Sequence, residues 1–514
     1  MYQLYRDRPL LVLSMIFANI LLSAWCLYLD PVINFDGVTY LSVAQLLLDG
    51  KTAAAMEYYS WPFYSIFIAA VAKLFALDVE MAAHVLNTLL ATSLTLAFVC
   101  IVADLSNNNR RIILIAMVVI LLFPSITKYR SFIIRDFGYL SCYLWSLFFI
   151  FRFCATANKK HLIGWLVFAA LSSLFRFEGI VFVLIAPYFL FLFGNTNFPH
   201  RKKILTALSA VISIASIALL FWYVNDKYMD SVEAAQIAGR DIQGLSDLFL
   251  ANIQQRLGEQ PLSLMAILGL SFSSTGEVSY ELLRRMAVFY AIFAVVAYMR
   301  AYVFREPLPR KIWFIYLVAN LLMLIGFSIF NNFLVSRYTM ASALTLLILA
   351  PFTIDRLISL LGDVNFKAKL ATWFMLAVLI LVSIEGLDVR TKKNYIKEAG
   401  QWVAENLPSD AHIYSNDKLV IYYAGRDSQT LMDRLYSLDL FNLFFETNEI
   451  KTFDYLVLIG EQDEIYSDTM RQTLAYKYGF PIKTFYADEG RYAFIYTTDY
   501  NYEYYEQFKQ DSGQ

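Results

Sequence analysis

The chain has 514 residues, of which 59% are hydrophobic and only 17% are charged, and its formal net charge is −1. A soluble globular domain usually has about a quarter of its residues charged, and a nucleic-acid-binding protein is usually basic, so the composition excludes both classes. All four cysteines lie in apolar segments, so the sequence implies no disulfide framework. We therefore expect an integral membrane protein.

Apolar segments long enough to cross about 30 Å of hydrocarbon recur from residue 9 to about residue 386. The first segment is longer than a signal-peptide core and has no Ala-x-Ala cleavage site, so we expect it to be retained as a helix. The candidate spans are 9–29, 82–103, 112–129, 137–154, 162–176, 179–194, 204–224, 285–304, 312–330, 338–354 and 369–386.

A shorter apolar segment, 61–77, begins with Trp61-Pro62 and contains Lys73. The basic clusters all face the cytoplasm only if one of the two segments 61–77 and 82–103 does not cross the membrane. We predict that 61–77 is an interfacial or re-entrant segment, because it is short and aromatic residues gather at its start. The result is a polytopic α-helical protein with about 11 to 13 membrane helices plus juxtamembrane helices, and with its N-terminus in the cytoplasm. The outer loops are then 30–81, 130–136, 176–179, 225–284 and 331–337.

The composition becomes polar after residue 387, which predicts two domains, a membrane domain 1–387 and a soluble domain 388–514 outside the cytoplasm. Its pattern predicts a small α/β domain. The expected strands are Ala411–Tyr414, Leu419–Tyr423, Tyr455–Ile459 and Ala493–Thr497, and the expected helices are 392–406 and 466–478. Two amphipathic segments, 244–257 and 261–272, are expected in the outer loop, as lids or as ordinary packing elements.

Asp36 directly follows the first span, where the chain leaves the bilayer. A carboxylate at this position is a candidate catalytic group. The alternative is that Asp36 caps or turns the chain into the amphipathic segment 38–48, because Asp-Gly is a common turn signal.

Charged residues also gather in three predicted outer turns, against the general bias of Lys and Arg to the cytoplasmic side. They are Lys128, Arg130, Arg135 and Asp136 in the first turn, Arg176 and Glu178 in the second, and Arg337, followed by Tyr338, in the third. Ionisable groups at membrane depth usually face a cavity or a partner, and arginine suits phosphate because it donates bidentate hydrogen bonds. The turns therefore predict a site for an anionic, lipid-linked ligand. Alternatively, Arg176 pairs with Glu178 and the other cations reach lipid headgroups.

Short motifs in this order resemble those of the polytopic GT-C glycosyltransferases that use polyprenyl-phosphate sugar donors. The protein O-mannosyltransferase and lipid A aminoarabinose transferase-like families are the most similar groups. The motifs are Asp36-x-x-x-Tyr40 with Asp49-Gly50, Trp61-Pro62, Ile134-Arg135-Asp136, Phe175 to Gly179, Ser336-Arg337-Tyr338, and Gln401 to Pro408 followed by Ile413 to Asp417.

The resemblance implies that Asp36 and Asp136 are the catalytic carboxylates. Asp36 would accept the proton of an acceptor hydroxyl, with inversion at the sugar carbon. Arg135, Arg176 and Arg337 would bind the donor phosphate, and Tyr40, Glu57, Glu178 and Tyr338 are candidate acceptor or cavity residues. Glu57 is otherwise a surface charge.

Asp36 and Asp136 are also candidate ligands of a divalent cation, Mg²⁺ or Mn²⁺, and no other cofactor is expected. The sequence has Arg135-Asp136-Phe137 where an Asp-x-Asp would occur, so the metal remains open.

The expected partners are a polyprenyl-phosphate sugar donor, a glycan, lipid or protein acceptor, and membrane lipids, with no nucleic acid. The expected location is the bacterial inner membrane, with the C-terminal domain in the periplasm. Two alternatives are a flippase or transporter of a lipid-linked saccharide, and an O-antigen ligase or polymerase-like enzyme.

Overall fold

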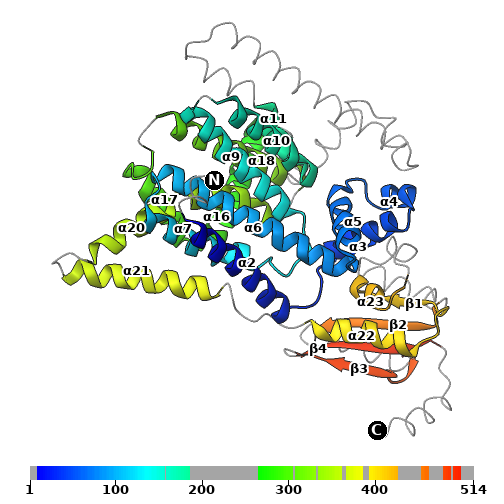
Figure 1. The fold of residues 1–514 in the computed structure, drawn as a ribbon. Helices are drawn as coiled ribbons and strands as arrows, with labels where there is room; N and C mark the ends of the chain where they lie inside the picture. Colours follow the sequence, from blue (N-terminus) through cyan, green and yellow to red (C-terminus); the bar gives the residue numbers. More distant parts are fainter. Residues whose placement is uncertain are drawn as a thin grey trace. The chain divides into compact units, whose positions relative to one another are not determined.

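The fold is taken from a computed structural model of the chain (Figure 1). The residues that the structure describes are 8–156, 158–185, 264–304, 307–331, 334–361, 366–385, 393–426, 453–461, 478–487 and 490–498. The predicted span 204–224, most of 179–194, the amphipathic segment 244–257 and residues 466–477 of the predicted tail helix lie outside these ranges.

The chain forms two compact units. The first unit consists of Met1–Ser23, Val85–Arg130 and Ile134–Asp388. The second consists of Ala24–His84, Ser131–Ile133 and Val389–Gln514, so it combines the first predicted outer loop with the C-terminal domain.

The membrane part is helical, and several of its helices are apolar enough to cross a bilayer. Their bounds are α2 (Pro9–Leu29), α6 (Val79–Leu105), α7 (Arg110–Leu121), α8 (Pro124–Thr127), α9 (Asp136–Thr156), α10 (Lys159–Phe175), η1 (Phe177–Gly179), α11 (Ile180–Leu184), α16 (Leu264–Arg285), α17 (Phe289–Met299), α18 (Pro307–Asn331), η2 (Ser336–Thr339), α19 (Met340–Leu347), α20 (Ala350–Leu360) and α21 (Phe366–Glu385). Among the described residues, four helices are long and apolar enough to span, or up to six if each of two bent pairs is one span. The chain is therefore a multi-pass membrane protein.

Three of the predicted spans are not single helices. The segment 112–129 is divided into α7 and α8 at residues 122 and 123. Within 285–304, the chain bends by 102° between α16 and α17, because Ala287 and Val288 adopt left-handed backbone angles. The segment 338–354 is likewise divided between η2–α19 and α20, with a bend of 49°. Hydropathy alone does not detect such breaks, because the bend residues are as apolar as their neighbours.

The first predicted outer loop contains three short helices, α3 (Phe35–Leu48), α4 (Thr52–Tyr58) and α5 (Phe63–Phe75). At 1.5 Å per residue, the 13 residues of α5 extend over about 20 Å, which is too short to cross the hydrocarbon. This length agrees with the assignment of 61–77 to the interface.

The described residues of the predicted C-terminal domain form a four-stranded sheet with helices α22 (Asn394–Asn406) and α23 (Lys418–Tyr423) (Figure 1). The strands β1 (Ile413–Ser415), β2 (Tyr455–Glu461), β3 (Lys483–Tyr486) and β4 (Arg491–Thr497) lie in the order β1-β2-β4-β3. β1 pairs with β2 in parallel, and the other pairs are antiparallel. The predicted α/β character of this part of the chain is confirmed. Its hydrophobic core is a cluster of tyrosine, phenylalanine and leucine side chains.

The predicted strand Leu419–Tyr423 is wrong, because these residues form α23. Asp417 caps this helix, and its Oδ1 accepts a hydrogen bond of 2.8 Å from the backbone N–H of Leu419. Gly400 of α22 allows the two helices to pack closely, since a Cβ there would lie 2.8 Å from the carbonyl oxygen of Val420. Strand β3 was not predicted.

Candidate active site

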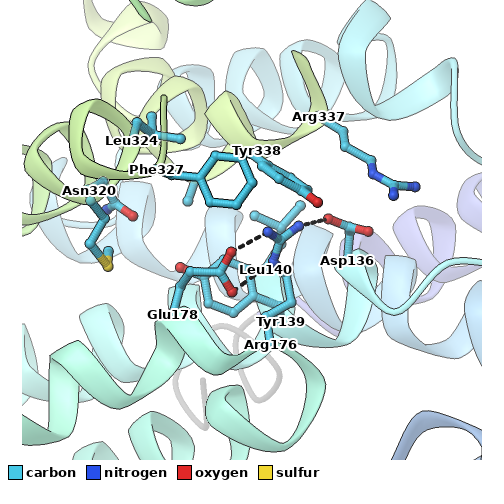
Figure 2. A pocket seen from close by; sticks show the side chains of 12 residues that line it. Asp136, Tyr139, Leu140, Arg176, Glu178, Asn320, Leu324, Phe327, Arg337 and Tyr338 are labelled. Atoms are coloured by element: carbon cyan, nitrogen blue, oxygen red, sulfur yellow. Dashed lines mark hydrogen bonds and ion pairs between the residues drawn. The ribbon is translucent and has the colours of Figure 1, made fainter. Parts of the chain in front are cut away.

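A buried cluster of three charged side chains lies in the first unit. Arg176 Nη1 donates to Asp136 Oδ1 at 2.5 Å, and each of these two residues is only 4% exposed. Arg176 also donates to both carboxylate oxygens of Glu178, from Nε at 3.2 Å and from Nη2. Figure 2 shows the Arg176 guanidinium between the two carboxylates. The pairing of Arg176 with Glu178, foreseen in the sequence as an alternative, is therefore present.

Local sequence brings these groups together. Helix α10 ends at Phe175 because Arg176 adopts an extended conformation, with φ −143° and ψ 133°, before the short η1 helix. Gly179 is needed in this turn, since a Cβ there would lie 2.5 Å from the backbone nitrogen of Ser173. A Cβ on Gly138 would overlap the ring of Phe175, so glycine at this position lets the end of α10 approach the start of α9. That approach places Asp136 next to Arg176.

The charge cluster lines an open cavity with an empty volume of about 410 Å³. One part of its wall is polar and includes Asn320 and Arg337 in addition to the cluster, and the rest is apolar or aromatic. The full lining is Asp136, Tyr139, Leu140, Arg176, Glu178, Asn320, Met323, Leu324, Phe327, Arg337, Tyr338 and Ala341. The cavity can therefore contact both a charged group and a hydrocarbon chain.

The aromatic ring of Tyr338 lies close to both arginines of the cavity wall, Arg176 and Arg337. Its ring lies 4.0 Å from Arg176 Cζ, measured to the ring centroid, and 5.9 Å from Arg337 Cζ. Phe327 meets the same ring edge-on, with 4.9 Å between the centroids. An aromatic face at this distance stabilises a guanidinium group in a site that has lost much of its water.

Electrostatic effects favour the charged forms of Arg176 and Glu178. Burial alone would raise the pKa of Glu178, but Arg176 and the nearby Arg135 outweigh burial and lower it. Burial alone would lower the pKa of Arg176, but Asp136 and Glu178 raise it well above its usual value. The lining carries two carboxylates and two guanidinium groups, Arg176 and Arg337, so its formal charges balance. Arg176 thus binds two carboxylates, and phosphate binding by Arg135, Arg176 and Arg337 stays a prediction.

A polar network buried in the helix bundle supports the cavity wall. Asn320 donates from Nδ2 to the hydroxyl of Tyr143 and to the carbonyl of Tyr316, both at 2.8 Å. Tyr143 in turn is hydrogen-bonded to Thr345 Oγ1 at 2.5 Å. The sequence pattern did not identify Asn320 and Tyr143 as residues near the site. Each differs from its apolar helical neighbours only by a polar group in the side chain.

Arg285 is a second buried arginine that the sequence did not single out. It donates from Nη2 to the hydroxyl of Tyr129 at 2.9 Å. It also donates to the hydroxyl of Ser336, and Ser336 directly precedes Arg337 in the chain. Its backbone carbonyl accepts a hydrogen bond of 2.7 Å from Ser125. Arg285 therefore connects two of the predicted outer turns and fixes the segment that carries Arg337.

Asp36 lies in the second unit, in the first turn of α3. The N-cap is Asn34, so Asp36 itself is not the cap, and its partly buried carboxylate lies where a helix dipole favours negative charge. Asn34 Oδ1 accepts a hydrogen bond of 2.7 Å from the backbone N–H of Ile133. Gly37 fits between these two residues, since a Cβ there would lie 3.2 Å from Ile133 Cβ.

The other predicted residues of the first loop lie in the same unit. Tyr40 is buried, with its ring edge-on to Tyr59 at 5.7 Å and to Tyr64 at 5.0 Å between centroids, so it forms part of the loop's core. Glu57 is exposed on α4. Thus the structure brings Asp136, Arg176, Glu178, Arg337 and Tyr338 together in one cavity. The pairing of Asp36 with Asp136 stays a prediction.

The described residues contain no group of three or more His, Cys, Asp or Glu side chains that could bind a metal ion. In addition, Asp136 Oδ1 already accepts from Arg176. The divalent cation therefore stays a prediction, without a ligand set.

Comparison with solved structures defines the class of fold. One match is the crystal structure of the Archaeoglobus fulgidus oligosaccharyltransferase, tethered to an acceptor peptide with the NVT sequon. The match covers 97% of the chain described here and 75% of the oligosaccharyltransferase chain. The TM-score is 0.50 and the sequence identity 11%. The chain therefore has a GT-C-like fold, which confirms the fold predicted from the motifs.

Two further matches are crystal structures of ArnT from Cupriavidus metallidurans, one in the apo state and one bound to undecaprenyl phosphate. Each match covers 94% of the present chain and 97% of the ArnT chain, with a TM-score of 0.38. The sequence identities are 11% for the apo structure and 10% for the complex. No protein-family model and no curated protein matches the sequence.

Proposed function

We propose that the protein is a membrane glycosyltransferase that moves a sugar from a polyprenyl-phosphate donor to an acceptor hydroxyl. The buried Asp136–Arg176–Glu178 cluster, which lines an open cavity in a GT-C-like fold, is the observation that carries this proposal. Buried charges are costly in a membrane protein, and they mark functional sites more often than structural ones.

The cavity has the two surfaces that a lipid-linked sugar phosphate requires. Leu140, Leu324 and Phe327 offer an apolar wall for a polyprenyl chain. Arg337, together with Arg135 near Glu178, supplies positive charge for the phosphate, which arginine binds through charge-assisted hydrogen bonds. In this assignment Arg176 acts mainly by orienting Asp136 and Glu178.

The proposed reaction is one direct displacement. The acceptor O–H gives its proton to Asp36, and its oxygen forms a bond to the anomeric carbon. The bond between that carbon and the phosphate oxygen breaks, and the lipid phosphate leaves with the electron pair. The arginines stabilise the charge that grows on this leaving group. Inversion at the anomeric carbon follows from a single attack.

The environment of Asp36 supports its role as the base. A partly buried carboxylate in the first turn of a helix has a fixed backbone and remains accessible to a substrate. Asn34 and Gly37 anchor this turn, so Asp36 is on a rigid element.

We also propose that transfer takes place on the extracytoplasmic face of a bacterial plasma membrane, with the N-terminus in the cytoplasm. The positive-inside bias supports this orientation, because Lys159 and Lys160 then face the cytoplasm. A cysteine at position 160 should not react with an impermeant thiol reagent added to intact cells, and reaction with it would contradict this orientation.

The test is sugar transfer by the purified protein in proteoliposomes, with a panel of radiolabelled polyprenyl-phosphate sugars and membrane extract as the acceptor source. Asp36→Asn should reduce transfer by about 10²- to 10⁴-fold at wild-type protein levels. Asp49→Asn is the matched control, because Asp49 is exposed at the other end of α3, where its Oδ1 accepts a hydrogen bond of 2.8 Å from Gln45 Nε2.

Full transfer by Asp36→Asn would refute the role of Asp36. Movement of an intact labelled donor across the bilayer without cleavage of its sugar–phosphate bond would instead establish the flippase alternative.

A further inference from the structure

One polar side chain interrupts the apolar part of the cavity wall. Asn320 belongs to α18, and Leu324 and Phe327 follow it about one and two turns further along the same face of this helix. Asn320 is only 3% exposed. In the view of Figure 2, Asn320 and Arg337 lie at opposite ends of the lining, with Glu178 between them. The cavity therefore has a buried amide at the end away from Arg337.

The hydrogen bonds of Asn320 fix the direction of its amide group. Its Nδ2 donates at 2.8 Å to the backbone carbonyl oxygen of Tyr316, which can only accept, so the nitrogen must lie on this side. The same nitrogen donates at 2.8 Å to the hydroxyl of Tyr143. An amide nitrogen has two protons, and both are used inside the helix bundle.

The groups beyond Tyr143 hold the network in one direction. Thr345 Oγ1 donates its only proton to the carbonyl oxygen of Ala341 at 2.7 Å. Thr345 must then accept the proton of the Tyr143 hydroxyl, at 2.5 Å, and the Tyr143 oxygen accepts from Asn320. Each proton in this series has one acceptor. The network therefore cannot reverse to give Asn320 a proton for a ligand.

The amide oxygen of Asn320 is the group left for a ligand. In the part of the chain that the structure describes, no side chain or backbone group donates to this Oδ1. A hydrocarbon chain against it would leave a buried acceptor without a bond, which weakens binding by about 5- to 100-fold. An ionised phosphate has no proton to donate. A sugar hydroxyl does, and it satisfies the acceptor.

We propose that Asn320 is a specificity residue, whose Oδ1 accepts a hydrogen bond from a hydroxyl of the sugar on the polyprenyl-phosphate donor. This inference rests on the proposed function, in which the cavity binds the lipid-linked sugar with its phosphate toward Arg337. Tyr143 is fully buried and outside the cavity lining, so it acts as a positioning residue for the amide. A site that accepts from a substrate hydroxyl rejects an analogue without it, because its own acceptor then stays unpaired.

The experiment measures equilibrium binding of tritiated lipids to the full-length protein in lipid nanodiscs. The probes are undecaprenyl phosphate without a sugar and undecaprenyl phosphate carrying glucose, galactose, mannose or arabinose. The sugar ratio is the Kd of the lipid without a sugar divided by the Kd of the lipid that binds most tightly with one. The variants are Asn320→Leu and Tyr143→Phe. Ser328→Ala is the matched control, because Ser328 is a buried polar residue of the same helix that binds Glu277 at 2.5 Å outside the cavity lining.

Wild type and Ser328→Ala should both give a sugar ratio of about 10 or more. In Asn320→Leu the ratio should fall to about 1, while the Kd of the lipid without a sugar stays within about twofold. Tyr143→Phe should lower the ratio by about 2- to 10-fold, because the amide loses one of its two anchors. One monodeoxy analogue of the preferred sugar should bind wild type about 10-fold more weakly than the parent, and should bind Asn320→Leu as well as the parent does.

An unchanged sugar ratio in Asn320→Leu overturns the inference, and so does a wild type that binds none of the four sugars better than the lipid alone. If Asn320→Leu no longer binds the lipid without a sugar, Tyr143→Phe decides, and an unchanged ratio there overturns the inference.

The two proposals can fail separately. A wild type that recognises the sugar through Asn320 but cleaves no donor supports this inference and refutes the proposed function. Sugar transfer by a protein whose sugar ratio does not depend on Asn320 supports the proposed function and refutes this inference.

Discussion

The buried ion pair between Asp136 and Arg176 should couple strongly in a double-mutant cycle. The two charges, about 4 Å apart, attract each other by about 4 kcal/mol at an effective dielectric constant of about 20, compared with about 1 kcal/mol in water. Arg176→Met leaves two carboxylates in the cavity wall and should lower the free energy of unfolding by about 3–5 kcal/mol. Asp136→Asn keeps the side-chain size and leaves Glu178 to bind Arg176, so its cost should be smaller, about 1–3 kcal/mol.

The double variant should be more stable than the sum of the single effects predicts, by about 1.5–3 kcal/mol. The reason is that Glu178, the carboxylate that then remains unpaired, has a side chain that is 29% exposed and can reach water. The measurement is equilibrium unfolding in mixed detergent micelles, followed by tryptophan fluorescence.

The chain offers a matched control pair in Arg111 and Asp355, whose side chains are 50% and 13% exposed. The same cycle with Arg111→Met and Asp355→Asn should give a coupling below about 1 kcal/mol, because solvent screens an exposed pair. If the coupling of the Asp136–Arg176 pair is no larger than that of the control pair, burial does not strengthen this cluster and the reasoning is refuted.

Two further predictions concern the same turn. Because Arg176 and Arg135 lower the pKa of Glu178, its contribution to stability is present above its unfolded pKa of about 4.3 and is lost as the pH falls through the lower folded pKa. The difference in unfolding free energy between wild type and Glu178→Gln should therefore be constant from about pH 7 to 5 and shrink below about pH 4.3, and a difference that does not vary with pH would contradict this. Gly179→Ala should cost about 1–3 kcal/mol in unfolding free energy, because the new methyl group meets the backbone of Ser173, whereas Gly326→Ala, with no atom near the added Cβ, should be neutral or slightly stabilising. Equal effects of the two glycine substitutions would argue against the close contact.

Much of the fold could be predicted from local pattern. The first span was placed at 9–29 and is α2, and 137–154 became α9 with small extensions, because the hydrocarbon requires about 20 apolar residues in a row. The local pattern did not predict the bend within 285–304, where the backbone of Ala287 and Val288 breaks the helix. It also predicted a strand at Leu419–Tyr423, where the structure has a helix. In the latter segment a capping Asp417 makes a helix of apolar residues that also fit a buried strand.

The residues of the candidate site could be predicted from the sequence, but the contacts between their side chains could not. The unusual charges of the predicted outer turns singled out Arg176, Glu178 and Arg337, because ionisable residues are rare within membrane helices. Their spacing did not indicate that Arg176 would bind Asp136 as well as Glu178. Nor did it single out Asn320, whose polar side chain lies within an apolar helix.

The sequence by itself determined that this is a polytopic membrane protein with an α/β tail, since hydropathy and strand patterns depend on neighbouring residues. The tertiary structure decided which charges meet, because those contacts join distant parts of the chain. Asp136 and Arg176 are 40 residues apart, and Ile33 and Tyr423 are 390 residues apart. Only folding brings such residues within a few ångströms, and for that reason the link between the C-terminal domain and the Asp36 turn could not be predicted from local pattern.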